Sequence, residues 1–120
     1  MEPVRKILFF GEYFEDFYDR HAKGAQAKID QVLNLIAHVE NVPKKFLKHV
    51  ENTDGLYEIR ISFRHSALRI FCFFDAERIL ILLNGFMKKK KKLPKNELLF
   101  AEKRKKEYFD QKLLGDRSHE

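Results

Sequence analysis

The order of apolar and polar residues along the 120-residue chain predicts helices on either side of a group of strands. Residues 4–10 are apolar with β-branched side chains and stop at Gly11, the pattern of a first strand. Residues 12–21 and 25–39 repeat apolar side chains at three and four positions, which predicts two amphipathic helices separated by Gly24. This helical hairpin is expected to pack its aromatic face on a sheet, with a partner-binding surface as the alternative.

The middle of the chain has the pattern of a sheet. Residues 44–51 are expected to form one or two helical turns before a turn sequence at residues 52–55. Residues 57–63 alternate apolar and polar side chains, as a strand with one buried face does. Residues 67–74 and 79–83 are apolar on both faces, so both should be buried strands, and the first should be central.

A last helix is expected from Pro94 to about Lys112, since proline is tolerated in a first helical turn. The chain is expected to fray after Gly115. Its length allows one core and is too short for two, so residues 1–115 should form a single domain and residues 116–120 a tail. The expected fold class is α+β, with an N-terminal helical hairpin on a mostly antiparallel sheet and a C-terminal helix.

The positive charge is concentrated in one part of the sequence. The formal net charge is +6, yet residues 88–106 hold ten lysines and arginines against two glutamates. This local excess of +8 leaves the rest of the chain at −2. Such a patch attracts phosphate backbones or acidic protein segments, and salt weakens the attraction.

Several other kinds of protein are disfavoured. No apolar run approaches the roughly 20 residues of a membrane-spanning helix, and Phe9 and Phe10 are too few for a signal-peptide core. The histidines share no metal-ligand spacing, Cys72 has no disulfide or nucleophile partner in the sequence, and the glycines are isolated. We therefore expect no membrane association, no metal and no cofactor, and a reducing cytoplasm as the compartment.

Arg69 interrupts an apolar strand, where a guanidinium has a large desolvation penalty. One explanation is that it pairs with an acid such as Glu58 or snorkels to solvent. It can equally stand on the floor of an open face, where its planar fork clamps a phosphate. Arg60 on the preceding strand would reach the same pocket if the two strands pair as a hairpin.

The lysine run, Lys88 to Lys92, also has two interpretations. Runs of five or more like charges are usually solvated tails. This run lies between a buried strand and a helix, so its ends are held and Lys88 and Lys89 are expected at the edge of the sheet. That position favours a binding site over a tail.

Residues 55–109 read GLYEIRISFRHSALRIFCFFDAERILILLNGFMKKKKKLPKNELLFAEKRKKEYF. They contain an L-Y-E-[LI]-R strand, a strand with an arginine followed by aromatic residues, an LL-x-GF-x-KK-x-x-K-x-P turn and a last helix rich in Lys, Arg and Glu. This segment, almost half of the chain, resembles the RelE/HigB superfamily of bacterial toxins, and within it the phage-derived Gp49-like HigB group. The helical hairpin precedes it in the expected order.

The resemblance implies a RelE-like α+β fold, a cytoplasmic toxin neutralised by a cognate helix-turn-helix antitoxin, and cleavage of mRNA on the ribosome. Arg69 matches the strand arginine that relatives place against the scissile phosphate, and Arg60 matches the basic residue of the preceding strand. Lys88 and Lys89 lie where relatives have a basic residue after the last strand. Where some relatives have a lysine next to the strand tyrosine, this chain has Glu58.

A metal-independent endoribonuclease of this kind needs a base for the 2′-hydroxyl, a cation for the phosphorane and an acid for the leaving 5′-oxygen. Arg69 and Lys88 are the candidates for charge stabilisation, and Glu58 or His65 for the base. Arg60 is a further candidate catalytic residue in the same pocket. Glu58 can instead form a salt bridge that holds an arginine in place. The remaining candidates for RNA or ribosome binding are Lys89, Lys90, Lys91, Lys92, Lys95 and Arg104.

Two other functions remain open. A ParE-like toxin would inhibit DNA gyrase by binding alone, without an active site. Arg69 and the lysines after the last strand argue against it, because such a protein does not need them. A non-toxic, phage-derived domain that binds RNA or serves a structural role is the third possibility.

Overall fold

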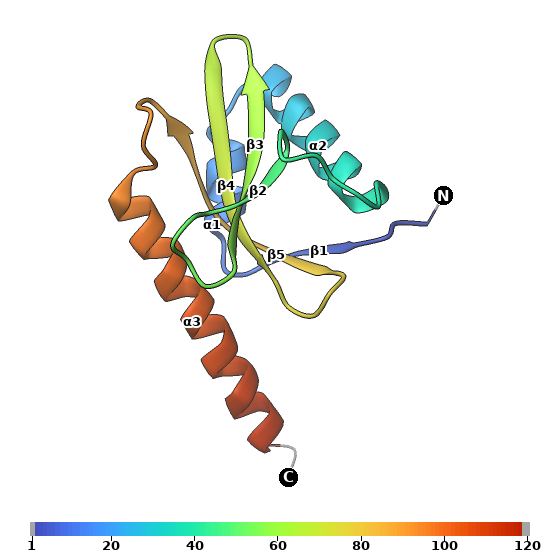
Figure 1. Ribbon diagram of the computed structural model, residues 1–120, viewed down its shortest axis with the longest axis vertical. Helices are drawn as coiled ribbons and strands as arrows, with labels where there is room; N and C mark the ends of the chain where they lie inside the picture. Colours follow the sequence, from blue (N-terminus) through green and yellow to red (C-terminus); the bar gives the residue numbers. More distant parts are fainter. Residues whose placement is uncertain (1, 119–120) are drawn as a thin grey trace.

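The computed structural model describes residues 2–118, which form three helices and a five-stranded sheet (Figure 1). In chain order the elements are β1 (Lys6–Phe9), α1 (Tyr13–Asp19), α2 (Lys23–His38), β2 (Leu47–His49), β3 (Leu56–Phe63), β4 (Ser66–Phe74), β5 (Ile79–Lys88) and α3 (Lys95–Ser118). The strands are ordered β1-β5-β4-β3-β2, with β1 parallel to β5 and every other neighbouring pair antiparallel. The predicted α+β fold class is confirmed.

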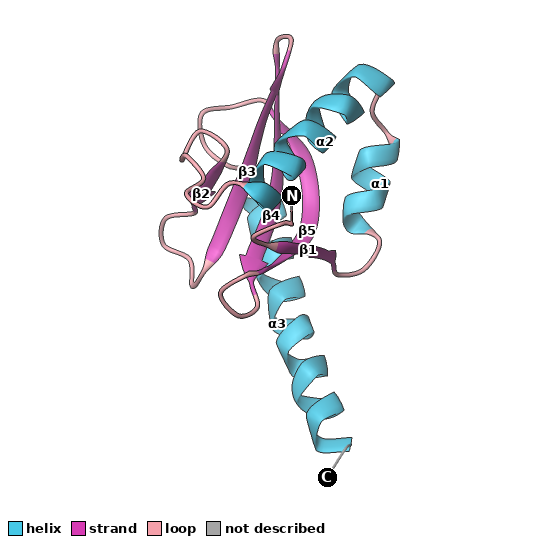
Figure 2. Cartoon of the chain, turned by 90° about the vertical axis from the view of Figure 1, so that its right-hand side faces the viewer, coloured by secondary structure: helices cyan, strands magenta, loops and turns pink. Residues whose placement is uncertain are grey.

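Different helices cover the two faces of the sheet. The helices α1 and α2 lie together on one side (Figure 2), where Phe14 and Phe17 of α1 are buried in the larger core. Helix α3 covers the other side, where its Ala101 is buried with Phe71 and Phe73 of β4. The aromatic face of the helical hairpin therefore packs on the sheet, as predicted. Strand β4 is buried on both faces and is central, which is also the prediction.

The structure corrects the prediction of helical turns at residues 44–51. Residues 44–46 form a turn, and β2 then pairs with β3 in a hairpin across residues 52–55. The Arg60 amide donates to the carbonyl oxygen of Phe46 at 2.8 Å. Isolated helices of one or two turns are marginal, whereas pairing with an existing strand satisfies the backbone groups of this segment.

Two further boundaries differ from the prediction. Gly24, expected to separate the two helices, lies inside the first turn of α2, and the chain leaves the helical conformation at residues 20–22 instead. Strand β5 continues past its predicted end at Leu83 as far as Lys88, because it remains paired with β4 up to Ala67. This extension places the start of the lysine run within the sheet.

The C-terminal half of α3 continues beyond the sheet (Figure 1), and the helix passes its predicted end near Lys112. The tail predicted at residues 116–120 is helical to Ser118, and its last two residues lie outside the described residues. Asp75 in the β4–β5 turn anchors α3, accepting hydrogen bonds from Lys112 Nζ (2.8 Å) and Tyr108 Oη (2.5 Å). These bonds lower the pKa of the Asp75 carboxyl, while burial and Asp75 raise the pKa of Tyr108 to about 12.

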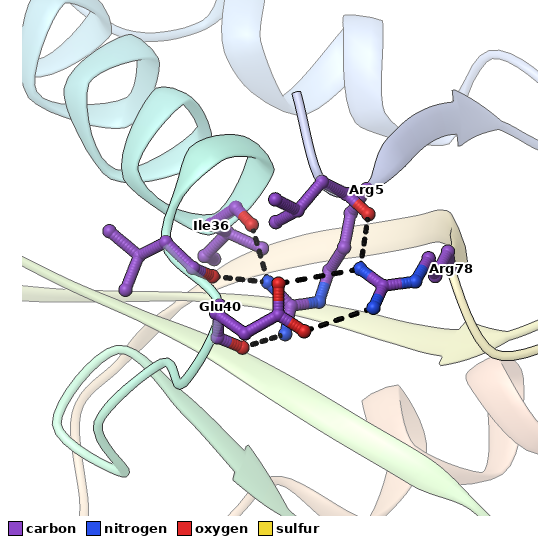
Figure 3. Close-up of polar contacts among 6 residues, drawn as sticks. Arg5, Ile36, Glu40 and Arg78 are labelled. Atoms are coloured by element: carbon purple, nitrogen blue, oxygen red, sulfur yellow. Dashed lines mark hydrogen bonds and ion pairs between the residues drawn. The ribbon is translucent and has the colours of Figure 1, made fainter. Parts of the chain in front are cut away.

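Two arginines fasten the N-terminal segment to the end of α2 and to the β4–β5 turn (Figure 3). The Arg5 guanidinium donates to the carbonyl oxygens of Ile36 (2.9 Å), Val39 (2.6 Å) and Glu40 (2.5 Å). Such carbonyls at a helix end have no partner within the helix. Arg78 donates to the Glu40 carboxylate at 3.0 Å and lowers the pKa of that carboxyl. These hydrogen bonds of Arg5 and Arg78 fix the start of β1, a short edge strand that pairs with β5.

Candidate nucleic-acid interface

The α3 side of the sheet carries the predicted site residues in adjacent rows that the strand register defines. Read from the β2 edge toward β5, the rows are Lys48, Glu58 and Phe71; Arg60, Arg69 and Phe86; and Ser62, Ala67 and Lys88. Cross-strand partners share a face of the sheet, with their Cβ atoms about 5 Å apart. Arg60 and Arg69 are therefore direct neighbours, as the hairpin prediction required.

Glu58 is buried between these two arginines. Its carboxylate oxygens lie 3.5 Å from Arg60 Nε and 3.9 Å from Arg69 Nε. The ion-pair interpretation of Glu58 is therefore confirmed. Burial lowers the pKa of the Arg69 guanidinium, Arg60 lowers it further, and Glu58 offsets only part of this shift. The fold thus holds the Arg69 charge at a net electrostatic cost.

The cluster leaves several buried polar atoms without a hydrogen bond. Arg60 Nε, Arg69 Nε and Glu58 Oε2 have no hydrogen-bond partner among the described residues. Both ion-pair distances exceed the roughly 2.7–2.9 Å of a charge-assisted hydrogen bond. Most buried polar groups in native proteins are satisfied, so such a cluster points to a functional role. Two neighbouring guanidinium groups that share a single carboxylate carry an excess positive charge, which suits a phosphate.

A groove of about 510 Å³ opens beside this cluster, between β2 on one side and the end of β5 on the other. Its charged lining is Lys48, Glu51, Glu58, Arg60, Lys88, Lys91 and Lys92. We call it the basic groove. Arg69 does not line the groove itself, but it lies next to Arg60 and Glu58, which do. Five cations against two carboxylates make the lining attractive to a polyanion.

The lysine run forms a ridge with two sides. Lys88, Lys91 and Lys92 line the basic groove. Lys89 and Lys90 line a second hollow of about 400 Å³ at the start of α3, which Lys92 also borders. The run is held between β5 and α3, as the prediction of a site at the sheet edge required.

The four lysines of the basic groove form no ion pair with a described residue, whereas several cations of α3 have a partner. The paired cations of α3 include Lys105 with the Asp54 carbonyl oxygen, Lys106 with Asp110, Arg104 with Glu107 and Lys112 with Asp75. In contrast, Lys48, Lys88, Lys91 and Lys92 form no ion pair with any residue that the structure describes. The groove lysines therefore keep their charge available to an external anion.

Three of the predicted site residues lie apart from the cluster. Arg104 places its guanidinium carbon 4.5 Å from the Phe100 ring centroid and pairs with a glutamate, so it serves packing rather than the groove. His65 is exposed in the β3–β4 turn, about 13 Å along the strand from Arg69 at a rise of about 3.3 Å per residue. Lys95 is exposed in the first turn of α3.

Lys48 is the site residue that the sequence interpretation overlooks. The sequence predicts helical turns for its segment, and helical turns would have no register with β3. A signal for the hairpin was present, because the turn residues 52–55 stand between two short runs that contain apolar side chains. With β2 in place, Lys48 lies directly opposite Glu58.

Within residues 2–118, no group of three or more His, Cys, Asp or Glu side chains is arranged to hold a metal ion. Nor does any helix in this range combine the length and apolarity needed to cross a bilayer. Cys72 is completely buried, which raises the pKa of its thiol well above the usual value. A buried thiol of this kind is chemically inert.

A family model, described as phage derived protein Gp49-like (DUF891), matches residues 16–106. The match spans most of the chain and includes every residue that lines the basic groove. No curated protein shows a significant match to the chain. The family match agrees with the resemblance carried by residues 55–109 and extends it towards the N-terminus, through α2 and into α1. The chain therefore belongs to the Gp49-like family of phage-derived proteins, which is a group of RelE/HigB-like toxins.

Proposed function

We propose that the protein is the toxin of a type II toxin–antitoxin system and that it cleaves mRNA on the ribosome without a metal. One observation carries the proposal. Arg60 and Arg69 are cross-strand neighbours that share the Glu58 carboxylate, beside a groove whose lysines form no ion pair with any described residue. The scissile phosphate of RNA is the ligand that suits this arrangement, because its charge increases in the transition state. Membership of a toxin group supports the same function.

In the proposed reaction the 2′-oxygen of the RNA attacks the adjacent phosphorus, and the bond from phosphorus to the 5′-oxygen breaks. Arg60 and Arg69 stabilise the charge that develops on the phosphorane. Glu58, which lines the basic groove between the two arginines, takes the proton from the 2′-hydroxyl. Lys88, at the end of β5, gives a proton to the leaving 5′-oxygen. His65 lies too far along the hairpin to act at the same phosphate.

The same surface suggests how the toxin is restrained. An acidic segment of a cognate helix-turn-helix antitoxin would bind across the basic groove and exclude RNA, since charge complementarity steers such complexes. In the absence of the antitoxin, the groove would meet mRNA and the ribosome in the cytoplasm.

The proposed activity can be tested by induced expression in a bacterium, with mapping of transcript 5′ ends. We expect growth arrest and new 5′ ends within translated regions, which disappear from a transcript whose start codon is removed. Growth arrest without new 5′ ends would instead favour a gyrase inhibitor. Normal growth would favour a non-toxic RNA-binding domain.

The two sides of the lysine ridge should contribute differently to RNA binding. Replacement of Lys91 and Lys92 by glutamine should lower the slope of log affinity against log salt by about 1.4, at about 0.7 per phosphate contact on single strands. Replacement of Lys89 and Lys90 is the matched control, because it removes the same charge from the other side. Positions of cleavage should not change in either variant. Equal slopes for both pairs would mean that only net charge matters.

A further inference from the structure

Lys48 and Lys88 occupy opposite corners of the sheet face that carries the two arginines. Lys48 lies across from Glu58 at the β2 edge, and Lys88 lies across from Ala67 on β5. The rows to which they belong are four residues apart along β3, and β2 and β5 are three strand spacings apart. With about 4.8 Å between strands and about 3.3 Å per residue, the two backbones are about 20 Å apart. Arg60 and Arg69 lie between them.

Lys48 is also free to bind an external group. Its side chain is exposed and lines the basic groove. It has no ion pair within the described part of the chain, and its neighbour Glu58 already lies between Arg60 and Arg69. The next lysine toward the N-terminus, Lys45, rests over the Phe46 ring at 5.5 Å and does not line the groove.

We propose that Lys48 binds a phosphate next to the scissile one, so that the RNA strand crosses the sheet diagonally from β2 to the lysine ridge. This inference rests on the proposed function and adds the path of the substrate. A line of cations about 20 Å long, with the arginine pair at its centre, suits successive phosphates of one strand better than a single phosphate. Proteins that bind single strands commonly follow the backbone with such a positively charged groove.

A contact to a flanking phosphate affects binding in the ground state and in the transition state equally. Such uniform binding lowers KM and leaves kcat unchanged. Lys48→Gln should therefore raise KM, while kcat and the positions of cleavage stay the same. Loss of Arg69, by contrast, should lower kcat.

The decisive experiment measures the binding of 2′-O-methyl RNA oligonucleotides of increasing length, which cannot be cleaved. For the wild type, affinity should rise in a step at the length that reaches from the arginine pair to Lys48. Lys48→Gln should lack this step, and on the longer oligonucleotides its salt slope should be lower by about 0.7. Lys44→Gln is the matched control, because Lys44 is exposed in the same segment and does not line the groove.

The outcomes separate this inference from the proposed function. A Lys48→Gln variant with the step and the salt slope of the wild type overturns the assignment. A wild type that shows the Lys48-dependent step but never cuts RNA supports the binding path and contradicts the nuclease. If the wild type binds no RNA and binds a polyglutamate peptide through Lys48, the groove is a protein-binding surface and the inference is wrong.

Discussion

Arg69→Met is expected to abolish growth inhibition and transcript cleavage while the melting temperature stays the same or rises. Arg69 lies directly opposite Arg60 and next to the Glu58 carboxylate, and there it would stabilise the charge of the phosphorane. Loss of one preorganised donor of this kind typically lowers kcat by about 10²–10³. The rate of cleavage by the purified protein on translating ribosomes, together with colony counts after induction, measures the effect.

The expectation for stability follows from the surroundings of Arg69. Burial and Arg60 lower the pKa of its guanidinium, and Glu58, 3.9 Å away, offsets only part of the shift. Replacement of a buried charge by an apolar side chain of similar volume is often neutral or stabilising. Glu58 would not be left alone, because Arg60 Nε lies 3.5 Å from its carboxylate.

Lys103→Met is a suitable control for Arg69→Met, since it removes one positive charge from the exposed surface of α3. It should remain toxic. If the Arg69 variant melts several degrees lower and remains toxic, Arg69 is a structural partner of Glu58 and has no part in the chemistry. The preference for a nuclease over a gyrase inhibitor would then lose its main support.

Gly85→Ala is expected to destabilise the fold strongly. A Cβ atom at Gly85 would lie 2.5–2.8 Å from three ring atoms of Phe17, closer than carbon atoms can approach. Phe17 is only 1% exposed and is held between α1 and the sheet, so its ring has little room to move. Overpacking of this kind costs about 1–3 kcal/mol. Thermal unfolding followed by circular dichroism should show a melting temperature lower by several degrees.

Gly115→Ala is expected to have the opposite effect on the stability of the same protein. Apart from the adjoining residues and the helix backbone, no atom of the described residues lies within 4 Å of the Cβ position at Gly115, which is part of α3. Alanine is favoured over glycine within a helix by up to about 1 kcal/mol. This variant should melt at the same temperature as the wild type or slightly higher. A Gly85→Ala protein that melts like the wild type would show that α1 can move away from β5 at little cost.

Much of the fold was open to prediction because its signals are local. The alternation in β3 correctly assigned Glu58 and Arg60 to one face, since successive side chains of a strand point to opposite faces. The uninterrupted apolar run of β4 indicated its central position. The segment that became β2 was misjudged, because a three-residue edge strand has too little pattern of its own.

The sequence by itself determined the order of the main helices and strands, the buried faces, the position of the basic segment and the family. Only the tertiary structure decided which lysines and arginines form ion pairs and which remain available to an external anion. Arg104 and Lys91 look alike in the sequence, yet one is paired on α3 and the other lines the groove. It also brought Lys48 opposite Glu58. The physical reason is that side-chain periodicity is a local property, whereas the partner of a charge depends on strand register and helix packing, which join residues far apart in the chain.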